Sequence, residues 1–220
     1  MVGLPAFCVA AVLLCTGCGG FAGVTCLDLL ILSVVAEVRT ADGSPAAAGA
    51  RLIVFAEAIV DTGWGAPLES ALYLSGGEHA VPRVDVRVEK PWYQSVDIRS
   101  VQVAVDDCGV REPTQVEVLL TLLPGAPPVR SVYLGHGGYG FSGRIAHQLS
   151  VVVDVAPGVS KEVAWMSTDT SVVVVDTAGR IRSRCRTVAG EAFVVAHSLV
   201  DPAVRDSVGV SVLPGTTGCT

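Results

Sequence analysis

The sequence predicts an all-β protein made of two β-sandwich domains in tandem behind an N-terminal targeting segment. Half of the residues are hydrophobic, yet beyond residue 40 no apolar run approaches the roughly 18–20 residues that a membrane-spanning helix requires. The apolar segments are short, rich in valine and separated by many of the 24 Gly and 12 Pro residues, which is typical of strands and turns. The length of 220 residues suits two domains, because single domains cluster near roughly 100–150 residues.

The charge balance excludes one class of partner. Charged residues make up 16% of the chain, the formal net charge is −6, and no basic block is present. A nucleic-acid-binding protein needs a basic patch to neutralise phosphates. We therefore expect no nucleic-acid partner.

The N-terminal segment, residues 1–18, contains an apolar stretch followed by small residues and Cys18. It resembles a bacterial lipoprotein signal, in which a cysteine is lipidated and becomes the mature N-terminus. It departs from that pattern because Cys15 stands where Leu is usual and because no Lys or Arg precedes the apolar stretch. The resemblance implies a lipid anchor on Cys18, a membrane partner and a place in the cell envelope, periplasmic or at the surface. An ordinary cleaved signal with secretion, and a membrane helix running on through Cys26, are the alternatives.

Cysteine usage agrees with export. Of the seven cysteines, four remain after removal of the signal and lipidation of Cys18, namely Cys26, Cys108, Cys185 and Cys219. Two accompany each proposed domain, so the simplest pairing joins Cys26 to Cys108 and Cys185 to Cys219. Each bridge would stabilise the fold by about 4 kcal/mol through loop entropy; four buried free thiols are the alternative. No Cys/His spacing suggests zinc, and we expect no metal or cofactor.

The first domain is predicted to span residues 27–123. Val84, Val86 and Val88 alternate with charged residues, and a period of two places the valines on one face of a strand. The runs VVAEVRTADGSPAAAGARLIVF and VEKPWYQSVDIRSVQVAVDDCGV resemble the carboxypeptidase regulatory-like domain, a transthyretin-like seven-stranded sandwich. The resemblance implies an accessory or stabilising unit without an active site.

The second domain is predicted over residues 129–214, after a Pro-rich linker at residues 124–128. The stretches VAWMSTDTSVVVVDTAGRIRS and AGEAFVVAHSLVDPAVRDSVGVSV resemble the bacterial Ig-like domain, group 2, of intimin- and invasin-type surface proteins. Trp165 and Gly179 fall where that family has its core tryptophan and its glycine turn, so the resemblance implies a large aromatic at the centre of the sandwich. Both domains are thus expected to be immunoglobulin-like sandwiches. The Gly-rich segment 134–143 is unlike a phosphate-binding loop, because no helix follows it to present N–H groups to phosphate. We therefore expect it to be a flexible loop.

No residue pattern indicates catalysis. The four histidines lack metal-binding spacing such as HExxH, and the serines lack a GxSxG setting. Trp64, Trp92 and Tyr93 lie in or beside predicted loops, where aromatic side chains stack on sugars or anchor protein partners.

We therefore expect a non-catalytic β-sandwich spacer, or an adhesion and recognition module, with an envelope protein or a glycan as its further partner. A carbohydrate-binding or envelope-assembly accessory protein is the second hypothesis, and a hydrolase on the transthyretin fold is the third.

Overall fold

The computed structural model describes residues 32–57, 59–66, 73–76, 81–135 and 137–215. All helical or strand structure in these residues is β, so the all-β prediction is confirmed. Within them, no helix has the length and apolarity to cross a membrane. Cys18, Cys26 and Cys219 lie outside the described residues, so the lipid anchor and both disulfide pairings stay predictions.

The first half of the chain forms two facing sheets and a hairpin. One sheet has the order β4-β1-β9, the other β3-β2-β5-β6, and β7 pairs with β8. Strand β1 lies at the centre of its sheet, antiparallel to β4 and parallel to β9. The strands are β1 Val34–Thr40, β2 Arg51–Ala56, β3 Ile59–Trp64, β4 Tyr73–Gly76, β5 Arg83–Glu89, β6 Val96–Gln102, β7 Ala104–Asp106, β8 Gly109–Glu112 and β9 Thr114–Leu120.

Alternation along the strands builds the first core. Val84, Val86 and Val88 are at most 2% exposed, whereas the charged residues between them on β5 are only partly buried. They pack with Leu52 and Leu120 from the two sheets in one hydrophobic cluster. Burial of each valine contributes about 1.5 kcal/mol or more, so the alternation read from the sequence contributes to the stability of this half.

The second half forms a second core from three small sheets. Their orders are β10-β13, β11-β18-β17-β14 and β12-β16-β15. Val194 and Val210 of the four-stranded sheet pack with Val153 and Ile181 of the two smaller sheets. The strands are β10 Val129–Tyr133, β11 Gly138–Ser142, β12 Ala146–Gln148, β13 Val152–Val155, β14 Val163–Ser167, β15 Val173–Val175, β16 Arg180–Ser183, β17 Gly190–Ser198 and β18 Arg205–Leu213.

The expectation of a flexible loop over residues 134–143 is wrong for its second half. Strand β11 occupies residues 138–142 and pairs in parallel with β18. Phe141 is 9% exposed and belongs to the second core. A Cβ on Gly138 would lie 3.2 Å from the carbonyl oxygen of Gly209, so glycine here permits close approach of two backbones rather than mobility.

Trp165 packs against the second core from β14, the end strand of its sheet, and is only partly buried. The fully buried positions of the sandwich are held by smaller side chains, among them Val173 and Ile181. The indole ring instead covers Gly179, where φ is +79° and an added Cβ would lie 2.6 Å from the ring. Trp165 therefore anchors the turn between β15 and β16 at the edge of the core.

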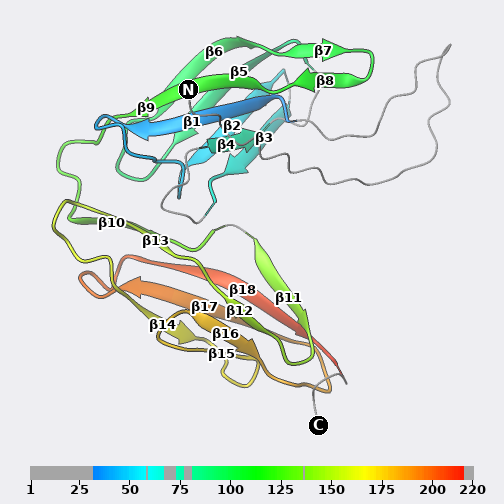
Figure 1. The fold of residues 1–220 in the computed structure, drawn as a ribbon, viewed down its shortest axis with the longest axis vertical. Helices are drawn as coiled ribbons and strands as arrows, with labels where there is room; N and C mark the ends of the chain where they lie inside the picture. Colours follow the sequence, from blue (N-terminus) through cyan, green and yellow to red (C-terminus); the bar gives the residue numbers. More distant parts are fainter. Residues whose placement is uncertain (1–31, 58, 67–72, 77–80, 136, 216–220) are drawn as a thin grey trace, which may run out of the picture.

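The two halves stack along the long axis of the molecule (Figure 1). The sheet β10-β13 of the second half is the part of that half that faces the first half, and the connection from β9 to β10 runs along one side. This arrangement creates a junction between the halves, formed by β10, β13 and the loops at one end of the first core.

Candidate functional site at the junction

The connection between the halves is hydrogen-bonded to both of them. The backbone N–H of Leu123 donates to the carbonyl of Trp92 at 2.9 Å, and the N–H of Ala156 donates to the carbonyl of Pro128 at 2.8 Å. Proline restricts the backbone of residues 124–128 further. The segment predicted as a linker is therefore a short, tied connection.

Tyr133 on β10 joins the second half to the first. Its side chain is buried, and its hydroxyl donates a hydrogen bond of 2.6 Å to the carbonyl of Gly65. A Cβ on Gly49 would lie 3.5 Å from the Tyr133 ring, and a Cβ on Gly65 would lie 1.8 Å from the carbonyl oxygen of Ala47. Small residues at this end of the first core thus allow the tyrosine to pack closely against backbone.

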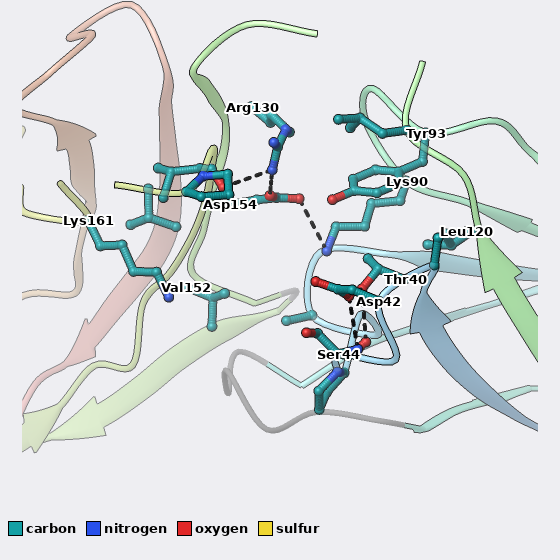
Figure 2. Close-up of a pocket in the computed structure, with 17 residues that line it drawn as sticks. Thr40, Asp42, Ser44, Lys90, Tyr93, Leu120, Arg130, Val152, Asp154 and Lys161 are labelled. Atoms are coloured by element: carbon teal, nitrogen blue, oxygen red, sulfur yellow. Dashed lines mark hydrogen bonds and ion pairs between the residues drawn. The ribbon is translucent and has the colours of Figure 1, made fainter. Parts of the chain in front are cut away.

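A buried ion cluster spans the junction (Figure 2). The Asp154 carboxylate of β13 lies 2.6 Å from Nη1 of Arg130 and 3.4 Å from Nζ of Lys90. The three side chains are 12%, 10% and 7% exposed respectively. Lys90 follows β5 of the first half, whereas Arg130 and Asp154 belong to β10 and β13 of the second half. The ion pair between Lys90 and Asp154 therefore connects the two halves.

Each of the two cations also donates to a backbone carbonyl. Nη1 of Arg130 also donates to the carbonyl of Val155 at 2.9 Å, and Nζ of Lys90 donates to the carbonyl of Ala46 at 3.3 Å. The run of alanines before Gly49 is buried, which brings this carbonyl under the ammonium group. Charge-assisted bonds of this kind are about twice as strong as neutral ones.

Burial shifts the ionisation of two groups at the junction. The pKa of Lys90 is lowered, first because burial disfavours the ammonium ion and only in part offset by the Asp154 carboxylate. The pKa of Tyr93 is raised to about 12, first by burial and then by the negative charge of Asp154. The ammonium of Lys90 also lies 5.4 Å from the centroid of the Tyr93 ring, a cation–π distance.

A cavity of about 470 Å³ opens beside the ion cluster, with walls from both halves. The first half contributes the turn at residues 40–48, with Asp42 and Ser44, together with Lys90 and Tyr93. The second half contributes Arg130, Asp154, Lys161 and apolar side chains of β13. Figure 2 shows the labelled side chains surrounding one open space, with Asp154 held between Arg130 and Lys90.

A second cavity of about 480 Å³ lies next to Trp64. The guanidinium of Arg51 sits 5.7 Å from the centroid of the Trp64 ring, and Lys90 borders this cavity as well as the junction cavity. Trp64 is 41% exposed. This cavity therefore places an exposed tryptophan side chain beside three charged ones, those of Arg51, Glu89 and Lys90.

The three aromatic residues predicted as ligand contacts are not brought into one site. Tyr93 is 9% exposed, belongs to the first core and lines the junction cavity. Trp64 borders the second cavity, and Trp92, 45% exposed with a φ of +67°, borders neither of the two cavities described above. Only Tyr93 thus reaches the site at which the halves meet.

No sequence pattern predicted the charged residues of the junction, Lys90, Arg130, Asp154 and Lys161. Two signals were present. Asp154 is the only charged residue in the apolar segment 149–155, and the chain has only two lysines, both of which line this cavity. A lone charge within a buried strand requires a partner, although the sequence does not say which one.

The described residues contain no group of three or more His, Cys, Asp or Glu side chains able to hold a metal ion. No protein-family model matches the chain, and no curated protein is significantly similar to it.

Proposed function

We propose that this protein is a non-catalytic spacer or recognition module of the bacterial cell envelope, built from two β-sandwich domains held at a fixed angle. The observation that carries the proposal is the junction. Asp154 pairs with cations from both halves, Tyr133 bonds to the first half, and the connecting segment is tied at both ends. A spacer transmits position only if its domains do not hinge, and these contacts oppose hinging.

The proposal includes the two family resemblances. We assign the first domain to the carboxypeptidase regulatory-like type, residues 27–123, and the second to the bacterial Ig-like group 2 type, residues 129–214. The sequence motifs support both assignments. The position of Trp165 over Gly179 supports the second, because it joins the tryptophan and the glycine turn of that pattern.

Anchoring is tested by metabolic labelling with a palmitate analogue. We expect label on the wild-type chain and none on Cys18→Ala, because a lipoprotein signal delivers its lipid to that one cysteine. The matched control is Cys15→Ala, which leaves the acceptor in place. A wild-type chain without label would remove the lipid anchor and leave a cleaved signal with secretion, or a membrane helix, as the alternatives.

Stiffness is tested by small-angle X-ray scattering of the full chain. We expect the wild type to scatter as one extended rigid body. Asp154→Asn should broaden the distance distribution, because it leaves two buried cations at the junction unpaired. An equally broad distribution for the wild type would overturn the spacer proposal without affecting the anchoring test.

Carbohydrate binding is the second candidate function. The exposed side chain of Trp64 beside a cavity with Arg51 at its edge favours it, because sugars stack on aromatic rings next to charged hydrogen-bonding groups. A glycan array should then show binding that Trp64→Ala abolishes. Trp92→Ala serves as the control, because Trp92 is similarly exposed but does not border this cavity.

A further inference from the structure

We propose that the cavity at the junction is a binding site for a small organic carboxylate. The proposal goes beyond the spacer function, which needs the contacts between the halves but no ligand. It rests on the charge of the cavity walls, the burial of the ion cluster and the apolar character of the remaining lining.

The cavity carries more positive than negative charge in an acidic protein. Its walls hold three cations, Lys90, Arg130 and Lys161, and two carboxylates, Asp42 and Asp154. The balance is therefore +1 in a chain whose net charge is −6. The excess is concentrated where solvent is scarce, because a single carboxylate, Asp154, serves two cations that are each at most 10% exposed.

Buried positive charge without a full set of counter-charges is costly. The lowered pKa of Lys90, caused first by burial, records this cost. Nε of Arg130, a buried donor, has no hydrogen-bond acceptor among the described residues. Oδ2 of Asp154 makes no hydrogen bond there either, but it lies 3.4 Å from the ammonium of Lys90 as an ion pair. An anion that enters the cavity would supply negative charge next to the buried cations Lys90 and Arg130. Its attraction to these cations would favour binding.

The rest of the lining selects an organic anion rather than an inorganic one. Pro45, Leu120, Leu122, Val152 and Pro157 supply apolar surface around the charged groups. A cavity of about 470 Å³ has the size of typical small-molecule sites, which are mostly apolar with a few placed polar groups. A carboxylate with a small carbon skeleton satisfies both parts of the wall, whereas phosphate satisfies only the charged part.

Asp42 is the carboxylate of the cavity wall whose removal should strengthen anion binding. Its carboxylate is held by the Thr40 hydroxyl at 2.5 Å and by the N–H of Ser44 at 3.1 Å, and these hydrogen bonds lower its pKa. It stays charged and repels an anion. Asn at this position accepts the same hydrogen bonds through its side-chain oxygen, so Asp42→Asn removes the repulsion and keeps the turn.

The two lysines give a direct probe of the site. Reductive methylation with ¹³C-formaldehyde labels lysine side chains and the N-terminal amine and keeps their charge. The chain has two lysines, and both line the cavity. We expect both lysine signals of the full chain to move, with one common dissociation constant, on addition of glucuronate or hexanoate at constant ionic strength. Glucose, the uncharged counterpart of glucuronate, should leave them unmoved.

Three variants complete the experiment. Lys161→Met should weaken carboxylate binding by roughly two- to fivefold, as expected for a solvent-exposed ion pair, and Asp42→Asn should strengthen it by a similar factor. Arg99→Met is the control, because Arg99 is an exposed cation on β6 that does not line the cavity.

The proposal is overturned if neither carboxylate moves the lysine signals, if glucose moves them equally, or if only inorganic phosphate binds. Equal loss of affinity in Arg99→Met and Lys161→Met would also overturn it, since general surface charge would then account for binding. None of these outcomes alters the scattering test of the rigid junction, so the two proposals fail separately.

Discussion

Two ion pairs of the same chemistry lie in very different surroundings in this protein. At the junction, Asp154 meets Arg130 and Lys90 with all three side chains nearly buried. On the outer face of the first half, Arg87 of β5 meets Asp97 of β6 at 2.6 Å with side chains 41% and 47% exposed. The distances are alike, but water screens the second pair and hardly reaches the first. We therefore expect the buried cluster to contribute more to stability than the exposed pair.

The largest effect is expected from Asp154→Asn. The change leaves two buried cations without their carboxylate, and breaking a buried ion pair in this way costs about 3–5 kcal/mol of unfolding free energy. Chemical denaturation of the full chain measures the loss. A loss below that of an exposed pair would show that water enters the junction freely.

The next effect depends on pH. The pKa of Tyr93 is about 12 in the folded chain and about 10 when unfolded. The folded state therefore keeps the proton that the unfolded state releases, and stability falls as pH rises from about 10 to about 12. Tyr93→Phe should lack this fall. Denaturation curves of both proteins across that range make the comparison, and parallel curves would contradict the shift.

Tyr133→Phe should have a smaller effect on the same junction. It removes the hydroxyl that bonds to the carbonyl of Gly65 while keeping the ring packed beside Gly49. Loss of one buried hydrogen bond to a neutral acceptor costs about 1 kcal/mol. The change in melting temperature measures it, and an effect as large as that of Asp154→Asn would mean that the hydrogen bond, rather than the ion cluster, holds the halves together.

The smallest effect is expected from Asp97→Asn on the exposed pair. Such exposed pairs contribute little to the free energy of unfolding and lose most of that contribution in salt. The pKa of Asp97 is lowered, first by its hydrogen bond to Arg87, so any contribution appears above the unfolded pKa of the carboxyl and is lost as pH falls through the lower folded value. Denaturation at low and high salt tests this. A loss matching Asp154→Asn would erase the distinction between the two pairs.

Local pattern determined the fold class. The valines of β5 at every second position and the Gly and Pro residues between strands act over neighbouring residues. Such patterns are visible in a sequence because the pleat repeats every two residues.

The prediction of a flexible loop over residues 134–143 was wrong because its glycines were taken as a sign of mobility. Gly138 instead lies against the backbone of Gly209, a residue 71 positions further along the chain. The need for a glycine arose from a strand pairing that no local pattern records.

The sequence by itself determined that the chain folds as strands in two cores, because burial of alternating apolar residues depends on near neighbours. Only the tertiary structure decided that Lys90 meets Asp154, 64 positions away, and that Lys161 and Asp42 lie on the walls of the same cavity. A charge in a buried strand shows that a partner must exist, but the partner is chosen by how two complete sandwiches pack. The site proposed here therefore belongs to the packing of the two halves rather than to a motif in either one.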